Sequence, residues 1–425
     1  MMSREFTTET LCIHGGYRAK SGEAQVLPIT QSTTYRHDSP EHLADLFDLK
    51  ELGWIYSRIG NPTVGHFEEK ISNLEGGIGG LAFASGQAAI TGAILTICSA
   101  GDHILASTNL YGGTITLFTS TLKKLGIEVT LVDPNAKKED IESLIKENTK
   151  IIYGETIGNP GLNVLDFEKF SSVAKENQIV FIVDNTFATP VLFKPLEHGA
   201  NIVIHSATKY IDGHATSLGG VIIDGGNFDW KASGRYPDLT EPDSSYHGLV
   251  FTEAFGPAAY IFKARVHILR DFGGALSPFN AFMLHNSLET LHLRVEKHCE
   301  NALQLALFLE GNDKVEWVKY PLLESHETYD LAKKYLTKGA SGVLSFGIKG
   351  GYDKAIQFME KIELISLVTH VGDLRTSVLH PASTSHRQLS KEEQNKSGVT
   401  PDLIRLSVGL ENINDLIIDL EEALK

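Results

Sequence analysis

The sequence predicts an α/β protein with a mainly parallel central sheet and a smaller C-terminal α/β domain. Between residues 64 and 223, short apolar runs of strand length alternate with segments of helical period, which is typical of βαβ units. A second, shorter set of strand and helix patterns lies between residues 315 and 424. The chain has 425 residues, too many for one simple core, and this length indicates two or three packed domains.

The N-terminal part, residues 1–65, mixes turn-forming residues with no clear amphipathic period, so we expect an arm or extended segment. Residues 64–77 then have the pattern of a helix that ends at two glycines. We expect strands at 80–85, 102–107, 128–133, 150–156, 179–185, 201–207 and 219–223, and helices at 86–101, 114–126, 138–149 and 166–178. Function in such a sheet collects at the carboxyl ends of the strands.

Residues 225–260 interrupt this rhythm, because they are rich in Gly, Pro, Ser and Asp and predict a long loop. Helical segments over 267–311 are then expected to bridge to the C-terminal domain. In that domain we expect strands at 315–321, 342–349, 376–381 and 403–411, and helices at 352–362 and 413–424. The chain therefore divides into an N-terminal arm (1–65), a large domain (66–272) and a C-terminal domain (273–425).

The composition is ordinary for a soluble globular enzyme, with 42% hydrophobic and 21% charged residues. The formal net charge of -15 argues against nucleic acid or an anionic membrane as a partner. The N-terminus carries no apolar signal core, and no stretch is long and apolar enough to span a bilayer. These features predict a soluble protein with a small-molecule partner.

The cysteines and histidines give no sign of a metal centre. Cys12, Cys98 and Cys299 are far apart and form no CxxC pair, which argues against a zinc ribbon and a disulfide framework and fits a reducing cytoplasm. The chain has 17 histidines but no HExxH motif, and HPASTSH (380–386) does not have a standard ligand spacing. No metal site is expected.

One lysine, Lys209, lies between two apolar runs that predict buried strands, and Ser206 and Thr208 bracket it. A surface lysine needs no such neighbours, whereas a nucleophile or a lysine that holds a cofactor does. Asp184 ends the preceding apolar strand. Because one strand–helix–strand step separates Asp184 from Lys209, their strand ends are expected to be neighbours. Taken alone, Asp184 could equally be a cap or turn residue.

Ser85, Gly86 and Gln87 stand where a predicted strand ends and a helix begins. The free backbone N–H groups and the dipole of such a helix make a phosphate site. In isolation, a plain helix with Ser85 as its N-cap is the preferred interpretation. The neighbouring glycines lack the GxGxxG spacing, and the chain has no Walker A motif, so a dinucleotide site is not expected.

Together these residues suit pyridoxal 5'-phosphate (PLP). Its aldehyde needs a lysine amine, its ring nitrogen needs an acid, and its phosphate needs N–H and hydroxyl donors. Lys209, Asp184 and the start of the helix at Gly86 could supply these groups. Further candidates are the hydroxyls of Ser206 and Thr208 for the phosphate, the ring of Tyr111 for stacking and the amide of Asn159 for the ring oxygen. The sequence therefore predicts PLP as cofactor.

Five motifs resemble those of the γ-subfamily of PLP-dependent transsulfuration enzymes: HSATKYIDGH, VDNTFATP, YSRIGNPT, NLYGGT and LIRLSVGLE. The resemblance extends over nearly the whole chain, from IHGGY to GLENINDL. It implies an aspartate aminotransferase-like (type I) fold with PLP in the large domain. It also implies a homotetramer, built as a dimer of dimers, in which each N-terminal arm contributes to a neighbouring active site.

The resemblance implies a role for each matching residue. Lys209 would form the Schiff base and later carry protons, Asp184 would hold the ring nitrogen, and Tyr111 would stack on the ring and take part in catalysis. The other cofactor-binding positions would be Ser85, Gly86, Gln87, Asn159, Ser206 and Thr208, with Tyr56 and Arg58 reaching the phosphate of the neighbouring subunit. Without the family, the loop that carries Tyr56 and Arg58 would be interpreted as a surface turn.

Arg405 interrupts the apolar strand predicted at 403–411. A buried guanidinium needs an anion, and its planar fork fits a carboxylate. An arginine on an edge strand in water is the alternative. The resemblance implies that Arg405 holds the α-carboxylate of an amino acid substrate, with Asn159 as a second substrate-binding residue.

Three features distinguish the branches of this family. NLYGGT has Gly113 where methionine-degrading lyases usually carry cysteine, and the segment 225–260 is longer than in the γ-synthases and cystathionine lyases. The tract HVGDLRTSVLHPASTSH has His370 in place of a serine that usually helps bind the substrate carboxylate, and Thr384 in place of a methionine. This tract, the long segment and RQLSKEEQNKSGVTPDLIRLSVGLE (387–411) resemble the O-acetylhomoserine sulfhydrylase branch.

The implied reaction is γ-replacement, in which sulfide displaces acetate from O-acetyl-L-homoserine to give L-homocysteine for methionine biosynthesis. Cystathionine γ-synthase and methionine or cystathionine γ-lyase activities stay open as alternatives. A PLP-binding protein with no catalytic role is a further alternative, which the combination of Lys209, Asp184, Tyr111 and Arg405 argues against. Acetyl and succinyl esters, and sulfide and other sulfur donors, also stay open.

Overall fold

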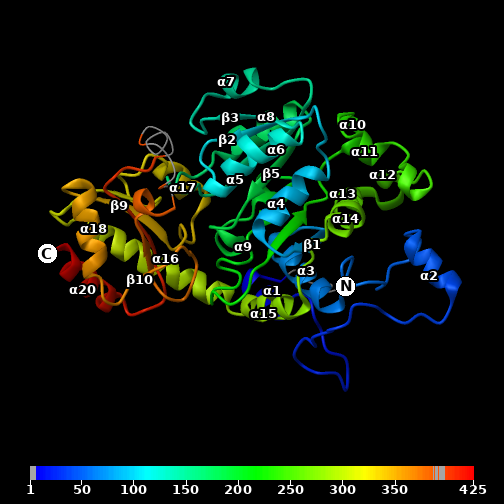
Figure 1. Ribbon diagram of the computed structural model, residues 1–425, viewed down its shortest axis with the longest axis horizontal. Coiled ribbons are helices and arrows are strands. Elements are labelled where there is room, and N and C mark those ends of the chain that lie inside the picture. Colours follow the sequence, from blue (N-terminus) through cyan, green and yellow to red (C-terminus); the bar gives the residue numbers. More distant parts are fainter. Residues whose placement is uncertain (1–5, 386, 388–390, 392–397) are drawn as a thin grey trace.

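The computed structural model describes residues 6–385, 387, 391 and 398–425. Two tracts named above, HPASTSH and the segment 387–411, therefore lie partly outside the described residues. The chain builds two sheets, and an N-terminal segment projects from the body of the large one (Figure 1).

The larger sheet has seven strands in the order β1-β7-β6-β5-β4-β2-β3. They are β1 (Gly79–Phe83), β2 (His103–Ser107), β3 (Glu128–Val132), β4 (Thr149–Glu155), β5 (Val180–Asp184), β6 (Ile202–His205) and β7 (Gly220–Asp224). Neighbouring strands from β3 to β6 run parallel, whereas β7 is antiparallel to both β6 and β1. The predicted mainly parallel sheet is confirmed.

Side chains that alternate along these strands build two hydrophobic cores, one on each face of the sheet. On β5, Phe181 enters the first core and Ile182 the second. Helices α3 (Pro62–Glu75) and α8 (Phe167–Glu176) cover the first face, and α4 (Gly86–Leu95) covers the second. Both faces are therefore apolar, and polar side chains collect where the strands end.

Local sequence signals set the ends of the helices. The side chain of Asn61 accepts the N–H of Thr63 at the start of α3, and Gly76 ends that helix in the left-handed conformation. The Ser85 side chain accepts the N–H of Ala88 at the start of α4. The other helical segments up to β7 are α5 (Gly112–Thr116), a π-helical turn (Leu117–Thr121), α6 (Leu122–Lys124), α7 (Lys138–Ser143), α9 (Thr189–Leu192) and a 3₁₀ turn (Pro195–His198).

The segment predicted as a long loop, 225–260, instead contains short helices. They are α10 (Trp230–Ser233), α11 (Pro237–Thr240), 3₁₀ turns (Ser244–Tyr246 and Gly256–Ala258) and α12 (Phe251–Phe255), followed by α13 (Ala259–Lys263), a π-helical turn (Ala264–Leu269) and α14 (Arg270–Phe272). The prediction missed them because Gly, Pro, Ser and Asp, which favour turns, are frequent in this segment. The apolar side chains of Trp230, Tyr236, Leu239 and Phe251 are nevertheless buried in the second core, and this burial orders the segment.

The smaller sheet has five strands in the order β10-β11-β12-β9-β8. They are β8 (Val315–Lys319), β9 (Val343–Ile348), β10 (Ser366–Leu367), β11 (Ser377–Leu379) and β12 (Leu403–Ser407). The helices of this part are α15 (Pro278–Leu288), α16 (Leu291–Glu310), α17 (Tyr329–Tyr335), α18 (Gly351–Lys361) and α20 (Ile413–Leu424). Its apolar residues belong to the same core as the first face of the large sheet, so the two sheets are packed together.

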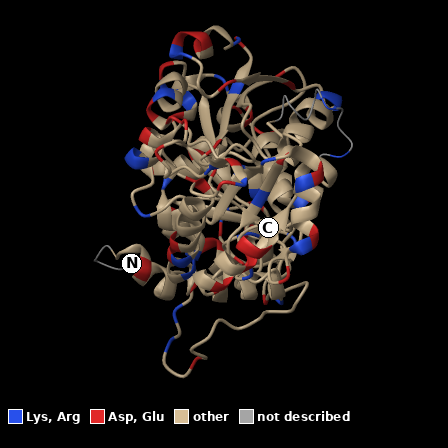
Figure 2. Ribbon diagram, turned by 90° about the vertical axis from the view of Figure 1, so that its left-hand side faces the viewer, with Lys and Arg blue, Asp and Glu red and all other residues tan. Residues whose placement is uncertain are grey.

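The N-terminal segment has little regular structure besides α1 (Thr8–His14) and α2 (Pro40–Phe47). Several of its large apolar side chains are exposed, among them Leu52, Val26 and Phe47. Figure 2 shows acidic and basic residues interspersed over the molecule rather than separated into faces of one sign. In the part of the chain that the structure describes, no helix is both long and apolar enough to cross a membrane.

Candidate active site

The ends of β5 and β6 lie side by side, as the sequence predicts. The two strands are parallel, and Asp184 is the register partner of Ile204. Asp184 is buried, and its Oδ1 accepts the N–H of Thr186 at 2.9 Å. Beyond β6 the chain turns at once, with the Lys209 N–H donating to the Ser206 carbonyl at 3.1 Å. The predicted acid and the predicted amine therefore leave adjacent strand ends.

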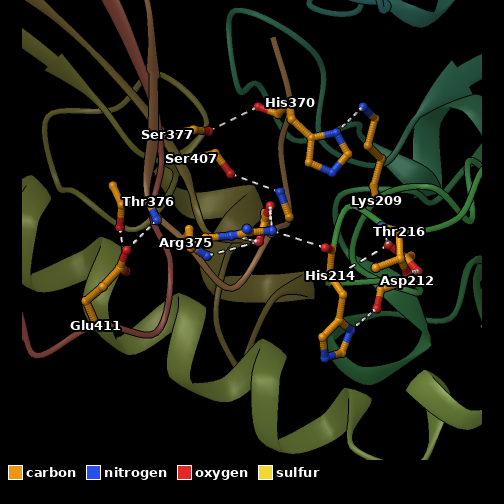
Figure 3. Close-up of polar contacts among 12 residues, drawn as sticks. Lys209, Asp212, His214, Thr216, His370, Arg375, Thr376, Ser377, Ser407 and Glu411 are labelled. Carbon is orange, nitrogen blue, oxygen red and sulfur yellow. Dashed lines mark hydrogen bonds and ion pairs between the residues drawn. The ribbon is translucent and has the colours of Figure 1, made fainter. Parts of the chain in front are cut away.

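The Lys209 side chain is partly buried and points toward the C-terminal part of the chain (Figure 3). Its Nζ lies 3.4 Å from Nδ1 of His370. Burial, and then the positive charge of Arg405, lower the pKa of the Lys209 amine to about 8. The neutral amine, which is the form that acts as nucleophile or base, is therefore far more populated near neutral pH than in an exposed lysine.

The loop that carries His370 ties the smaller sheet to the lysine. The Gly372 N–H donates to the Ser407 hydroxyl at 2.9 Å, and the Ser377 hydroxyl donates to the His370 carbonyl at 3.3 Å (Figure 3). Burial and the nearby charge of Lys209 lower the pKa of His370 below its ordinary value. The neutral ring thus offers Nδ1 to Lys209 as an acceptor.

Arg405 lies on β12, where it pairs with Ser345 of β9 and Leu379 of β11. It therefore occupies an inner strand, not the edge strand of the alternative interpretation. Burial lowers the pKa of its guanidinium. No ion pair joins this guanidinium to a carboxylate of the residues that the structure describes, whereas Arg375 pairs with Asp373 at 2.9 Å. A partly buried cation without such a partner is suited to bind an anionic ligand.

The start of α4 is packed against the segment that leads to Lys209. A Cβ atom built on Gly86 would lie 2.7 Å from the Ser206 Cβ, and one built on Gly220 would collide with the Ser85 carbonyl. Only glycine permits this close approach of β7 to the helix start. The Thr208 hydroxyl donates to the Gly219 carbonyl at 3.2 Å. The predicted phosphate ligands are therefore brought together in one cradle.

Tyr111 closes the other side of this cradle. A Cβ atom on Gly113 would lie 2.5 Å from Cε1 of the Tyr111 ring and 3.0 Å from the Gln87 amide nitrogen. The tyrosine is 51% exposed, so its ring has a free face. The Tyr111 backbone N–H donates to Oε1 of Glu155 at 2.7 Å. This hydrogen bond fixes the backbone position from which the Tyr111 side chain extends.

Glu155 is a site residue that our sequence reasoning missed. It ends β4 as Asp184 ends β5, and the two are register partners. Burial raises the pKa of Glu155 well above its ordinary value, and the charge of Asp184 raises it further. Burial also raises the pKa of Asp184, and this effect outweighs the hydrogen bonds from Thr186, which lower that pKa. Its position as the last residue of an apolar run was the signal that could have identified Glu155.

The remaining predicted residues lie at two places. Asn159 follows β4 in the turn after Glu155 and is partly buried. Tyr56 and Arg58 instead line a cavity of about 580 Å³ with Arg270, Asp271 and residues of the N-terminal segment. The Arg58 guanidinium donates to the Arg270 carbonyl there and lies 5.3 Å from the centre of the Tyr56 ring. None of the residues around Lys209 lines this cavity.

The residues gathered around Lys209 fit PLP. They provide a primary amine of lowered pKa, a buried carboxylate on the adjacent strand end, and a helix start packed against the hydroxyl-bearing Ser206. They also provide an aromatic ring with a free face and a guanidinium without a carboxylate partner among the described residues. In these residues no group of three or more His, Cys, Asp or Glu side chains could hold a metal ion.

Comparison with known proteins agrees with this arrangement. The sequence model of a family described as Cys/Met metabolism PLP-dependent enzyme matches residues 9–425. An O-acetyl-L-homoserine sulfhydrylase of Leptospira meyeri is 48% identical, with 100% of this chain and 98% of the relative covered. A second, O-acetyl-L-homoserine sulfhydrylase 1 of Thermus thermophilus, is 49% identical, with 98% and 99% covered.

Two further relatives extend the comparison. The homocysteine synthase of Schizosaccharomyces pombe is 48% identical, with 98% of each chain covered. A crystal structure from Campylobacter jejuni, assigned there as an O-acetylhomoserine (thiol)-lyase, superposes with a TM-score of 0.95 at 42% identity, with 99% of this chain and 100% of that chain covered. One lysine of that structure is present as N'-pyridoxyl-lysine-5'-monophosphate.

Proposed function

The chain belongs to the family of Cys/Met metabolism PLP-dependent enzymes, and on that premise we propose that it makes L-homocysteine and acetate from O-acetyl-L-homoserine and sulfide. The type I PLP fold implied by the resemblance is confirmed. One observation supports this choice of reaction. The chain is 48 to 49% identical, over nearly its full length, to relatives named for this activity. That similarity favours sulfhydrylation over the synthase and lyase alternatives.

Lys209 is proposed as the residue that holds PLP and moves protons. When bound, PLP supplies an electron-withdrawing ring that stabilises negative charge at the α-carbon of the substrate. The Lys209 amine, whose pKa burial lowers to about 8, would be the base that removes the proton at the α-carbon of the bound substrate. The same group would return protons to the product, because a group with this pKa both accepts and donates protons near neutral pH.

The other residues of the site are proposed to hold the cofactor. Asp184 pairs with the ring nitrogen and keeps it protonated, and Tyr111 stacks on the ring and takes part in catalysis. Asn159 binds the ring oxygen. The phosphate is held by the N–H groups of Gly86 and Gln87 and by the side chains of Ser85, Ser206 and Thr208. What supports these roles is the packing of α4 against Ser206, beside the adjacent ends of β5 and β6.

Arg405 is proposed to bind the α-carboxylate of the substrate, with Asn159 as a second contact. The guanidinium lies on an inner strand of the smaller sheet and makes no ion pair with a described carboxylate. Its charge lowers the pKa of Lys209, which indicates that the two groups are near each other. A carboxylate on Arg405 therefore places the adjacent α-carbon within the reach of Lys209.

We further propose that the protein acts as a homotetramer, a dimer of dimers with shared sites, in the cytoplasm. The arm (1–65) carries Tyr56 and Arg58 in a cavity that the residues around Lys209 do not line, and exposes Leu52 and Val26. Such a segment is suited to cover a neighbouring subunit and to place Tyr56 and Arg58 on its phosphate site. The large domain (66–272) and C-terminal domain (273–425) supply the rest of each site.

Product analysis tests the reaction. The purified, PLP-loaded protein is given O-acetyl-L-homoserine with sulfide in one assay and with L-cysteine in another. We expect homocysteine from the first and little cystathionine from the second. Cystathionine as the main product would make the protein a γ-synthase, and 2-oxobutyrate with ammonia would make it a lyase. Replacing the acetyl with the succinyl ester shows which ester it prefers.

A further inference from the structure

A buried polar cluster lies behind the strand ends that carry Asp184 and Lys209. Its centre is Glu75, the last residue of α3, which is fully buried. Oε1 of Glu75 lies 2.6 Å from Nε2 of His205 and accepts the side-chain N–H of Asn185 at 2.8 Å. The Thr156 hydroxyl donates to Oδ1 of Asn185 at 2.7 Å. All four side chains are closed off from water.

Asn185, His205 and Thr156 are each adjacent in sequence to a residue of the candidate site. Asn185 directly follows Asp184, the last residue of β5, and His205, the last residue of β6, precedes Ser206. Thr156 follows Glu155 at the end of β4, and its N–H donates to the Asp184 carbonyl at 3.0 Å. The side chain of Glu75 therefore joins the ends of three neighbouring strands. These are the strand ends from which the cofactor residues extend.

The ionisable side chains nearest to Asp184 belong to the two neighbouring strands and to the helix behind them. They are Glu155 and Tyr153 on β4, and His205 on β6, behind which stands Glu75 on α3. Burial raises the pKa of Asp184, and the charge of His205 opposes that rise. Glu75 contacts both His205 and Asn185, so its side chain connects α3 to the ends of β5 and β6, beside Asp184.

We propose that Glu75, His205 and Asn185 are positioning residues that fix the Asp184 carboxylate and keep it ionised opposite the ring nitrogen of PLP. The inference rests on the proposed role of Asp184. A carboxylate buried without water or a counter-charge is unfavourable, and α3 could end in an apolar residue if it served packing alone. The cluster has instead one imidazole and one amide directed at a single oxygen of Glu75.

The same helix offers a matched control. Glu68 precedes Glu75 by seven residues on α3, which places both on the same side of the helix. It is also buried, pairs with Arg265 at 2.6 Å and accepts the N–H of Ala82 at 2.8 Å. Its partners belong to β1 and to the helical turn before α14, so Glu68 contacts none of the β4, β5 and β6 ends from which Glu155, Asp184 and Lys209 extend.

The experiment compares Glu75→Gln and Glu68→Gln in the full-length holoenzyme. For each variant we measure the melting temperature, the Kd for PLP and the pH dependence of the visible absorbance of the bound cofactor. Both variants should lower the melting temperature. Only Glu75→Gln should weaken PLP binding, by about tenfold, and move the absorbance midpoint to higher pH by about half a unit or more. The direction follows because a neutral Asp184 releases the ring-nitrogen proton and removes a positive charge from the cofactor.

Equal Kd values and equal absorbance midpoints in the two variants would overturn the inference, because Glu75 would then serve stability alone. If Glu75→Gln does not fold, His205→Gln is measured in the same way. That variant keeps an N–H donor for Glu75 but carries no charge, so it should show the same shift, and an unshifted midpoint would overturn the inference. Product identity, measured on the unaltered enzyme, tests the proposed function separately from these cofactor properties.

Discussion

The two sheets contribute different kinds of side chain to the candidate site. The large sheet ends in two buried carboxylates, Asp184 and Glu155, on adjacent strands. The smaller sheet presents Arg405, and the loop beside it presents His370. Lys209 follows the end of β6 and points toward the smaller sheet, where the charge of Arg405 contributes to lowering its pKa and His370 lies 3.4 Å from its Nζ. On the roles proposed above, the large sheet serves the ring of the cofactor and the smaller sheet serves the carboxylate of an amino acid substrate.

Substitution of Lys209 should have the largest effect on catalysis. Lys209→Ala removes both the nucleophile and the proton carrier, and we expect kcat/KM to fall by about 10³-fold or more. Lys209→Arg keeps the positive charge but has no amine that can attack PLP, so its kcat/KM should fall equally far. Borohydride treatment followed by mass spectrometry should find PLP attached to the unaltered protein and to neither variant. Retained attachment in Lys209→Ala would assign another lysine.

Arg405→Ala tests the smaller sheet. Loss of the charge-assisted contact with the substrate carboxylate should lower kcat/KM by about 10²-fold, mainly through KM. The Kd for PLP should change little, because the cofactor side of the site lies on the large sheet. Arg375→Ala is the control, since that guanidinium is already paired with Asp373. A fall in PLP affinity that matches the fall in kcat/KM would break the division between the sheets.

The lowered pKa of Lys209 gives a pH dependence. Only the neutral amine attacks PLP, and burial places the pKa at about 8. The rate of covalent attachment of PLP to the apoprotein should therefore rise about tenfold per pH unit below that value and level off above it. Stopped-flow absorbance records this rate. A rate that still rises between pH 9 and pH 10 would mean that the amine keeps the pKa of an exposed lysine.

Gly113→Cys tests how the Tyr111 ring is held. The added Cβ lies 2.5 Å from that ring, so the ring must move, at a cost of about 1 kcal/mol, or about fivefold in the Kd for PLP. Gly113→Ala adds the same Cβ and should be equally impaired. Fluorescence titration with PLP measures both. Normal binding by Gly113→Ala together with weak binding by Gly113→Cys would place the conflict at the sulfur instead.

His370→Leu should have the smallest effect. The ring accepts a contact from Lys209 at 3.4 Å, which favours the protonated amine. Its removal should lower the pH midpoint of PLP attachment by about half a unit. His370→Asn, which keeps an acceptor, should stay closer to the unaltered protein. A midpoint that moves upward in His370→Leu would show that the imidazole acts as a repelling cation instead.

Much of the large domain could be predicted from the sequence, because its strands are continuous apolar runs that end in polar residues. That pattern located Asp184 and Lys209 and made their strands neighbours, as the pairing of β5 with β6 confirms. Arg405 was recognisable because a charge within an apolar strand is unusual. In each case a local pattern carried information about distant structure, because parallel strands bring their ends together.

The rest depended on contacts that no local pattern encodes. Glu75 looked like an ordinary helix end, and its partners are 110 and 130 residues away. The approach of His370 to Lys209 joins residues 161 apart. The segment 225–260 was misjudged because Gly and Pro outweighed a few apolar residues whose burial decides its structure. Tertiary packing, rather than propensity, determined these regions.

The antiparallel strand β7 has a consequence for how the chain is made. Strand β1 is complete by residue 83, yet its partner in the sheet is β7, which begins at Gly220. The start of α4 is held against Ser206 only when β7 has inserted between β1 and β6. A nascent chain on the ribosome therefore lacks this packed helix start until more than half of it has been synthesised, so on the proposed roles cofactor capture follows, and cannot guide, the first steps of folding.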